Sequence, residues 1–241
     1  MGEKIRLFVD AGLCADAEIA LSRDQAHYLS AVMRRGLGDR LAVFNGRDGE
    51  WRAEIAEIDK RAARLICLEP LRKQTAPPDL WLAFAPIKKA RTDFIAEKAC
   101  EMGCRRVIPV FTRHTNSERV NRARLQAHAV EAAEQCGLLS IPEIAEPISL
   151  ERFLAGLSER QILFCDESGT GAPARDVLAE AGAGPWVILT GPEGGFSEEE
   201  AARLRAREDA HAVSLGPRIL RADTAAVAAL ALWQSVLGDW Q

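Results

Sequence analysis

The sequence has no long apolar run and no strong excess of charge of one sign. Its 241 residues carry a formal net charge of −4, so no global positive field indicates nucleic acid as a partner. No stretch has the apolar length of a signal sequence or of a membrane span. We therefore expect a soluble, cytoplasmic protein. With 48% hydrophobic residues, the chain can bury a substantial core in one large domain or two smaller ones.

Candidate metal ligands are few and scattered. The six cysteines include no CxxC pair, and the four histidines do not cluster. Cys100 and Cys104 are one helical turn apart, but no second pair of ligands stands near them in the sequence. We expect no metal site, and we expect reduced thiols of a cytosolic protein.

The usual phosphate-binding glycine motifs are also absent. No GxGxxG follows the first strand and no GxxxxGK[ST] occurs, which disfavours a Rossmann dinucleotide site and a P-loop. Glycines gather instead in VILTGPEGGFSEEE (residues 187–200) and in SLGPRILRADTA (residues 214–225). Each segment has the pattern of a strand, a glycine-bearing loop and a helix. We call the two loops, residues 189–195 and 215–221, the first and the second glycine loop.

The glycine loops predict a pocket. Glycine lets a backbone approach a ligand closely, and Ser197 with Glu200 has the pattern of a helix capping box. If the loops follow neighbouring strands, their backbone amides and carbonyls line one site. Two ordinary strand-to-helix turns are the alternative interpretation.

Residues 1–72 have the pattern of a mostly antiparallel β domain with one helix, which predicts a small barrel. Strands are expected in KIRLFVD, RLAVFN, GEWRAEIAEI and ARLICLEPL, with NGRDG as a hairpin signal. LSRDQAHYLSAVMRR predicts a helix, with Ser22 as N-cap and Gln25 three residues later. KQTAPPD, residues 73–79, has two prolines and reads as a linker.

After the linker, strand and helix patterns alternate to the end of the chain. Strands are expected at residues 80–85, 106–111, 161–165, 186–190 and 212–215, and helices at 91–102, 119–136 and 223–237. This alternation predicts an α/β domain with a parallel sheet and helices on both faces. Ligands of such sheets bind at the carboxyl ends of the strands, where Gly191 and Gly216 are expected.

The composition of the glycine loops favours a ligand without a phosphate chain. The loops contain few lysines, and backbone groups can read the edge of an adenine nucleoside. Leu189, Leu215, Ile219 and Leu220 are available to cover its faces, and Glu193 would tolerate a cationic ligand.

Positive charge is concentrated in residues 86–124, which hold ten Lys or Arg against four acids, a local net charge of +6. Such a segment inside a net-acidic chain is a candidate phosphate-facing patch. A solvated helix face is the alternative. The connection TRHTNSERVNR is long and polar, as suits a segment that grips RNA.

The two loop segments together resemble the carboxyl-terminal signature of the RsmE family of 16S ribosomal RNA methyltransferases, which belong to the SPOUT class. RLFVD, HYLSAVMRRGLGD, EKACEMGCRRVIPVFT and EAAEQC agree with the same family, so the resemblance covers nearly the whole chain. Two departures stand out. EQCGLLSIPEI lacks an arginine that the family often has before the proline, which weakens the expectation of one RNA contact. Asp223 replaces a glutamate and keeps the carboxylate.

The resemblance implies a PUA-like RNA-binding β-barrel over residues 1–72 and a SPOUT α/β domain with a trefoil knot over residues 73–241. It further implies a homodimer and S-adenosylmethionine as methyl donor, with S-adenosylhomocysteine as product. The acceptor it implies is N3 of a uridine near the decoding centre of 16S rRNA in the small ribosomal subunit.

The resemblance and the local chemistry together give candidate site residues. The candidates for holding the cofactor are Leu189, Thr190, Gly191, Glu193, Gly194, Gly195, Leu215, Gly216, Ile219, Leu220, Thr224 and Ala225. The candidates for binding RNA are Arg34, Arg35, Arg113, Arg119, Arg122 and Arg124. The candidates for catalysis are Arg218 and Arg221, which would stabilise a developing uracil anion, and Glu193, which would orient the cofactor or relay a proton. The sequence does not identify a general base.

Two other interpretations stay open. One is a SPOUT methyltransferase with another target, such as a transfer RNA ribose or a different rRNA base. The other is a ribosome-assembly factor that binds RNA without catalysis. The segment TAAVAALALWQSVLGDW is apolar around most of a helix, so we expect it to be buried in the core or against a partner chain.

Overall fold

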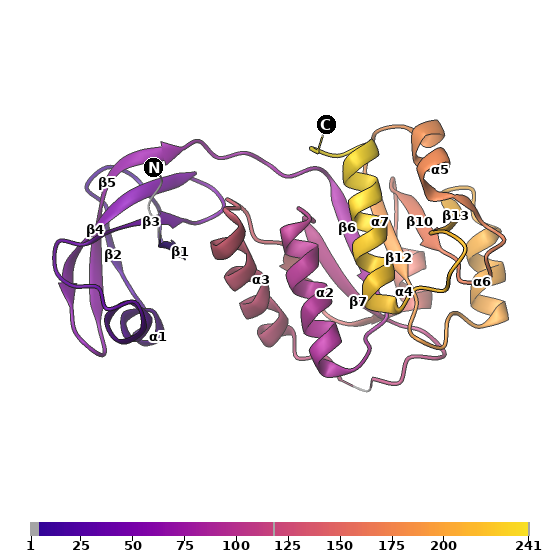
Figure 1. The fold of residues 1–241 in the computed structure, drawn as a ribbon, viewed down its shortest axis with the longest axis horizontal. Helices are drawn as coiled ribbons and strands as arrows, with labels where there is room; N and C mark the ends of the chain where they lie inside the picture. Colours follow the sequence, from indigo (N-terminus) through magenta and orange to yellow (C-terminus); the bar gives the residue numbers. More distant parts are fainter. Residues whose placement is uncertain (1–4, 118, 241) are drawn as a thin grey trace. The chain divides into compact units, whose positions relative to one another are not determined.

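The computed structural model describes residues 5–117 and 119–240. The chain forms two compact units (Figure 1). The first comprises Met1–Ala76 with Ala133–Ile141, and the second comprises Pro77–Ala132 with Pro142–Gln241. Helix α3 (Arg122–Cys136) begins in the second unit, and its last residues group with the first.

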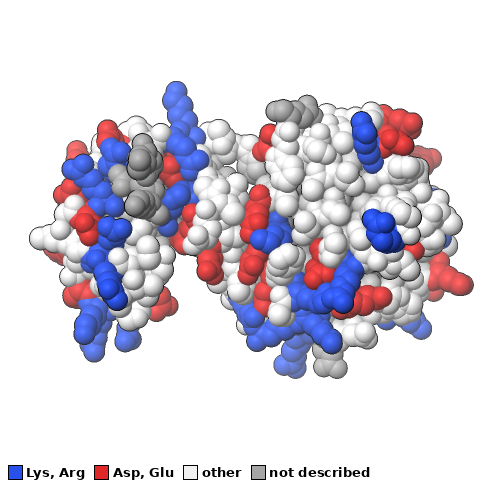
Figure 2. Space-filling view, in the orientation of Figure 1, with Lys and Arg blue, Asp and Glu red and all other residues white. Residues whose placement is uncertain are grey.

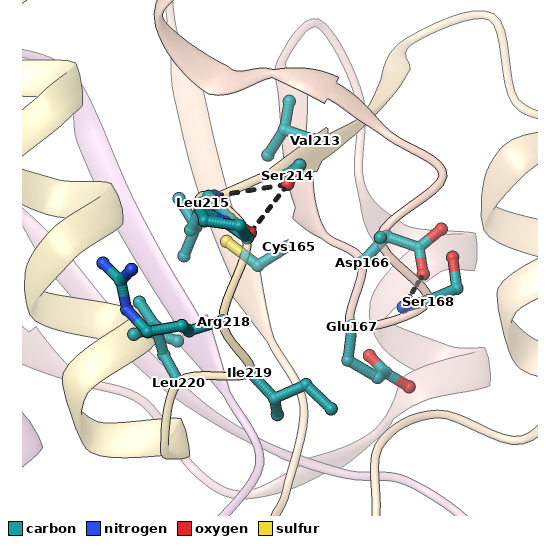
Figure 3. A pocket seen from close by; sticks show the side chains of 14 residues that line it. Cys165, Asp166, Glu167, Ser168, Val213, Ser214, Leu215, Arg218, Ile219 and Leu220 are labelled. Carbon is teal, nitrogen blue, oxygen red and sulfur yellow. Dashed lines mark hydrogen bonds between the residues drawn. The ribbon is translucent and has the colours of Figure 1, made fainter.

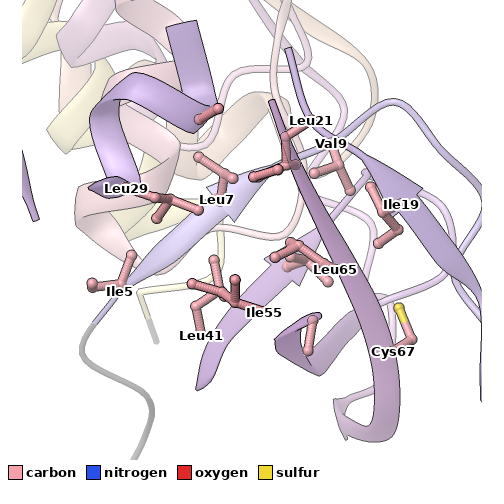
Figure 4. Close-up of a cluster of buried hydrophobic side chains, with 14 of the residues drawn as sticks. Ile5, Leu7, Val9, Ile19, Leu21, Leu29, Leu41, Ile55, Leu65 and Cys67 are labelled. Carbon is pink, nitrogen blue, oxygen red and sulfur yellow. The ribbon is translucent and has the colours of Figure 1, made fainter. Parts of the chain in front are cut away.

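The first unit is built on a five-stranded sheet with the order β1-β3-β4-β5-β2. Its strands are β1 (Arg6–Phe8), β2 (Glu18–Ala20), β3 (Arg40–Phe44), β4 (Glu50–Ile58) and β5 (Ala63–Arg72). All pairs are antiparallel except β1 with β3. Alternate side chains of these strands form one buried apolar cluster, which includes Leu7, Ile55 and Leu65 (Figure 4). The expected strands are confirmed, and β2 is a short strand that the sequence pattern did not reveal.

Helix α1 (Arg23–His27) begins where the capping pattern predicts. The Ser22 hydroxyl accepts from Gln25 N, and the Gln25 side chain accepts from Ser22 N. The helix continues as one π-helical segment, η1 (Tyr28–Val32).

A buried carboxylate organises one side of the first unit. Glu50 Oε1 accepts from Arg6 Nε at 2.6 Å, and Glu50 Oε2 accepts from Arg72 Nε at 2.7 Å. Arg6 also donates to the carbonyls of Ala133 and Leu138, both at 2.6 Å, at the carboxyl end of α3. Burial alone would raise the pKa of Glu50, but the hydrogen bonds from Arg72 and Arg6 outweigh it and hold that pKa below its usual range.

The second unit is a parallel α/β structure, as the alternating pattern predicts. The main path of its sheet runs β11-β13-β10-β12-β6-β7-β8, with β9 paired to β7, and every pair is parallel. The strands are β6 (Leu80–Phe84), β7 (Arg106–Phe111), β8 (Glu143–Ile144), β9 (Ile148–Ser149), β10 (Gln161–Cys165), β11 (Ala172–Pro173), β12 (Trp186–Thr190) and β13 (Ala210–Ser214).

Helices cover both faces of this sheet (Figure 1). They are α2 (Lys89–Glu101), α4 (Leu150–Gly156), α5 (Ala174–Ala181), α6 (Glu198–Arg205) and α7 (Ala222–Val236), with the first part of α3. Val187 and Leu189 of β12 pack in one cluster with residues of α4 and α6. The opposite face of β12 meets α7, which also packs on α2 and α5.

One expectation about the sheet is wrong. The strands that lead into the two glycine loops, β12 and β13, are not neighbours, because β10 lies between them and pairs with both. A third loop, which follows β10, therefore stands between the two that the sequence singled out.

Four of the cysteines, Cys67, Cys100, Cys104 and Cys165, are buried. In the part of the chain that the structure describes, no His, Cys, Asp and Glu side chains group as a metal site would require. Over the same residues, no helix has the length and apolar character needed to cross a membrane.

Candidate functional site

A cavity of about 490 Å³ opens at the carboxyl ends of β10 and β13 (Figure 3). Its lining comes from two segments, residues 165–169 after β10 and residues 213–220 at the end of β13, with Ala225 of α7. The volume is typical of a small-molecule site. The edge of the sheet is the one at which parallel α/β folds bind ligands.

The loop after β10 was not predicted, and it supplies the acidic wall of the cavity. Asp166 is buried and accepts from Arg205 Nε at 2.8 Å and from Ser168 N at 3.0 Å. Burial opposes ionisation, but these bonds outweigh it and hold the pKa of Asp166 below its usual range. Glu167 lies on the same wall (Figure 3). The sequence signal was present, because CDESGTG also follows a strand with an acid and glycines.

Cys165 lies in the cavity wall, and its thiol is held in the protonated form. Burial and the neighbouring Glu167 carboxylate raise the pKa of its thiol to about 12. A thiol that stays protonated is a poor nucleophile at neutral pH.

The second glycine loop forms the opposite wall. Gly216 has φ +114°, a conformation that favours glycine, and the Ser214 hydroxyl accepts from Gly216 N at 3.2 Å. Leu215 and Leu220 line the cavity, and Ile219, which also lines it, is 86% exposed. An apolar side chain held this openly at a cavity is available to cover an apolar ligand face.

The first glycine loop borders the lining segments without lining the cavity itself. Glu167 Oε1 accepts from Phe196 N at 2.8 Å, which joins the end of this loop to the cavity wall. Gly195 has φ +67°, and a Cβ there would lie 2.1 Å from Glu167 Oε1. Gly191 is also confined, because a Cβ there would lie 2.8 Å from the Phe196 ring.

The cofactor candidates thus divide into two sets. Leu215, Gly216, Ile219, Leu220 and Ala225 line the cavity. The other candidates, which are not part of its lining, are Leu189, Thr190, Gly191, Glu193, Gly194, Gly195 and Thr224.

The first glycine loop faces a second cavity, of about 520 Å³. Glu193 lines it, together with Lys88 and Lys89 at the start of α2 and with Asn116 and Ser117. Arg113 N donates to Glu200 Oε1 at 2.8 Å, and His114 Nδ1 lies 3.1 Å from Gly194 O. The segment after β7 that contains Arg113 and His114 therefore contacts both the first glycine loop and α6.

The arginines proposed for RNA differ in their surroundings. Arg122 donates to Ile144 O and to Glu146, and Arg124 pairs with the buried Asp93. Arg113 and Arg119 are exposed, and no ion pair of their side chains occurs among the described residues. Figure 2 shows Lys and Arg side chains gathered near the lower ends of α2 and α7.

The two arginine candidates of the first unit follow η1. Arg34 is exposed and has φ 53°, which is uncommon for a residue with a side chain. The Nε atom of Arg35 is buried with no hydrogen-bond partner among the described residues.

The candidate catalytic arginines are exposed, and both belong to the second glycine loop. Arg218 lines the first cavity, and Arg221 is the N-cap residue of α7. In the first turn of α7, Asp223 pairs with Arg91 at 3.1 Å.

Comparison with known proteins identifies the two parts of the chain. A model of the RNA methyltransferase domain matches residues 73–234, and a model of the RNA methyltransferase PUA domain matches residues 21–66. The ribosomal RNA small subunit methyltransferase E of Rickettsia conorii is 31% identical over 94% of this chain and 93% of its own length.

Solved structures agree with this assignment. A Legionella pneumophila protein solved with the bound cofactor SAM has a TM-score of 0.87 and 28% identity, with 98% of each chain covered. The ribosomal RNA small subunit methyltransferase E of Neisseria gonorrhoeae, solved with S-adenosyl methionine, has the same fold, with a TM-score of 0.88 at 24% identity over 98% of this chain and 99% of that one. The chain therefore belongs to the RNA methyltransferase family and is similar over nearly its whole length to a ribosomal RNA small subunit methyltransferase E.

Proposed function

We propose that this protein transfers a methyl group from S-adenosylmethionine (SAM) to N3 of a uridine near the decoding centre of 16S rRNA. The observation that carries the proposal is the cavity of about 490 Å³ at the ends of β10 and β13. The Legionella protein of the same fold binds SAM, and the Rickettsia relative is named for small-subunit ribosomal RNA. Residues 73–241 would perform the transfer, and residues 1–72 would bind RNA.

The residues around the cavity fit SAM. Glu167 offers a negative charge to a cationic ligand, and Leu215 and Leu220 offer apolar surface to an adenine ring. The buried Thr190 Oγ1 has no hydrogen-bond partner among the described residues, so the first glycine loop has an unused hydroxyl. When bound, SAM supplies a methyl group made electrophilic by the positive sulfur. The predicted cofactor residues of both glycine loops would hold it, with Glu167 as an addition.

The acceptor base sets two requirements for the protein. Uracil N3 is hidden in a base pair, so the target nucleotide must be unpaired or extruded. N3 must also lose its proton, which places negative charge on the ring oxygens. Arg218 and Arg221, both exposed on the second glycine loop, are proposed to stabilise that charge. Glu193 is proposed to orient the cofactor.

RNA is proposed to bind along the basic segment and at Arg34 and Arg35. Arg113 and Arg119 are the strongest candidates, because their exposed side chains are available for phosphates. Arg122 and Arg124 would first have to leave Glu146 and Asp93, so they are expected to contribute less.

A homodimer in the cytoplasm is part of the proposal. Helix α7 buries Ala226, Leu230 and Trp233, while Val227, Ala228, Ala231 and Leu232 on its other side are only half-buried. On α2, which packs against α7, Phe94 is 38% exposed. This apolar surface suits a second copy of the chain.

Two measurements test the function. Isothermal titration with SAM is expected to show binding. The absence of binding would exclude a methyltransferase with either RNA target and would favour a ribosome-assembly factor that binds RNA without catalysis. Incubation of unmodified small ribosomal subunits with methyl-labelled SAM, followed by mapping of the label, is expected to identify N3 of one uridine. A label on another nucleotide, or on transfer RNA, would exclude this target and favour the alternative substrate.

A further inference from the structure

A histidine, His114, touches the first glycine loop. Its Nδ1 lies 3.1 Å from the carbonyl oxygen of Gly194. A carbonyl oxygen can only accept, so Nδ1 carries the proton of the neutral ring. Nε2 then has the free lone pair, and the side chain is exposed. The contact therefore sets the tautomer that can accept a proton.

The segment that carries His114 is held in place on both sides. Arg113 N donates to Glu200 Oε1 at 2.8 Å, and Thr115 Oγ1 accepts from Thr112 N at 2.9 Å. A Cβ at Gly194 would lie 3.3 Å from His114 Cβ, so the backbone of the first glycine loop comes close to the ring. These contacts restrict the position of the imidazole relative to the predicted cofactor loop.

The surroundings suit an acceptor that becomes an anion. His114 is not itself part of the lining of the cavity of about 520 Å³, but Glu193, which precedes Gly194, and Asn116, two residues after His114, both line it. Lys88 and Lys89 line the same cavity and bring positive charge that would stabilise a deprotonated uracil ring. The cavity is next to the first glycine loop but is lined by different residues from the proposed SAM cavity.

We propose that His114 is the general base of the reaction, an inference that rests on the proposed function. Nε2 takes the N3 proton, and the electron pair of the broken N–H bond stays on N3. That pair forms the new bond to the methyl carbon, while the electrons of the broken carbon–sulfur bond remain on sulfur. The imidazolium afterwards releases its proton to water.

Neighbouring carboxylates are less suited to this role. Glu200 is occupied by Ser197 N and Arg113 N, and Asp223 is paired with Arg91. Glu193 faces the cavity, but among the described residues no hydrogen bond orients its carboxylate, whereas the contact with Gly194 O orients the His114 ring. The imidazole is therefore the better proton acceptor.

Two substitutions separate a base from a structural contact. His114→Asn retains an amide that can donate to Gly194 O but has no basic nitrogen, and His114→Ala removes both. The single-turnover methylation rate of small subunits is expected to fall roughly 100-fold or more in both variants, with SAM affinity unchanged. Added imidazole is expected to restore part of the rate of His114→Ala. His211→Gln, at a histidine of β13 that lines neither of these two cavities, is the matched control.

Two results would overturn the assignment of His114 as the base, and a third would refute the proposed function instead. The proposal would be overturned if His114→Asn methylates at the wild-type rate while His114→Ala is slow. That result would mean that His114 only holds the loop through its hydrogen bond to Gly194 O. Nitrogen NMR of the free protein is expected to find the Nδ1-protonated tautomer, whereas the Nε2-protonated form would overturn the proposal without any activity measurement. A wild-type protein that methylates no RNA would instead refute the proposed function.

Discussion

Glu167 occupies the space that a side chain at Gly195 would need. A Cβ at Gly195 would lie 2.1 Å from Glu167 Oε1, and the same oxygen accepts from Phe196 N at 2.8 Å. A side chain at residue 195 would therefore displace the Glu167 carboxylate from the fit between the cavity wall after β10 and the end of the first glycine loop.

Substitution Gly195→Ala tests this fit. The alanine must adopt φ +67° and displace Glu167 from Phe196 N, so we expect a loss of about 2 kcal/mol in the free energy of unfolding. Gly38→Ala is the control, because Gly38 has φ +81° but nothing within 4 Å of its Cβ position; it should cost only about 1 kcal/mol. Urea unfolding measures both. We also expect weaker SAM binding in Gly195→Ala alone, and equal losses with equal affinity would contradict the fit.

Asp166 makes stability depend on pH in a defined direction. Its pKa is lowered in the folded state, so its contribution is present above the unfolded value of about 3.9 and is lost as the pH falls through the lower folded value. Asp166→Asn should therefore destabilise the protein by about 1–3 kcal/mol at pH 7, with a smaller difference from wild type below pH 4.

The control for Asp166 is Asp10→Asn. Asp10 is 94% exposed in its pair with Arg47, so its replacement should change stability little at either pH. A difference between wild type and Asp166→Asn that persists unchanged at pH 3 would argue against the ionised pair with Arg205.

Glu50→Gln tests the buried carboxylate of the first unit. The change removes the charge that holds Arg6 and Arg72, so the carbonyls at the end of α3 lose well-oriented donors. We expect faster amide hydrogen exchange in residues 133–138 and a loss of about 1–3 kcal/mol in unfolding free energy. Glu54→Gln, on the same strand but in an exposed pair with Arg40, is the matched control and should leave that exchange unchanged.

The basic segment gives a prediction about salt. Arg113→Ala with Arg119→Ala should weaken RNA binding and reduce the slope of log affinity against log salt by about 1.5, because two phosphate contacts are lost. Arg122→Ala with Arg124→Ala should mainly lower stability, since these side chains are engaged with Glu146 and Asp93. Filter binding at several salt concentrations measures the slope. If the first pair lowers SAM affinity and leaves RNA binding intact, the patch assignment is wrong.

Ile219 offers a test of the proposed SAM cavity that leaves the core untouched. The side chain is 86% exposed, so Ile219→Ala should not change the melting temperature. If it covers the adenine face, SAM affinity should fall about fivefold to tenfold, in line with roughly 1 kcal/mol of lost apolar contact. Leu37→Ala, at a site 74% exposed in the first unit, is the control for both measurements. Unchanged SAM affinity would remove Ile219 from the site.

Local patterns in the sequence were sufficient for most elements. Both capping boxes are found where serine and its partner three residues later predict them. The strands β10 and β12 have the predicted bounds, because short apolar runs between turn residues are a local signal. The parallel α/β class followed from their alternation with helices.

The neighbours of each strand could not be predicted in the same way. Nothing in the residues of β12 or β13 shows that β10 lies between them, so Glu167 was missed although its loop forms one wall of the cavity. The pairing of Arg124 with Asp93 joins residues 31 apart and depends on how α2 packs against α3. The trefoil knot stays a prediction, because hydrophobic periodicity carries no information about how a chain threads.

Residues 198–200 are three consecutive glutamates that the sequence presents as equivalent. Among the residues that the structure describes, only the third accepts two backbone hydrogen bonds, since Glu200 Oε2 accepts from Ser197 N and Glu200 Oε1 accepts from Arg113 N. Glu198 and Glu199 are exposed at the start of α6. We therefore expect the first two positions to tolerate almost any polar residue over evolutionary time. The third should admit no shorter acid, because aspartate cannot reach both amides.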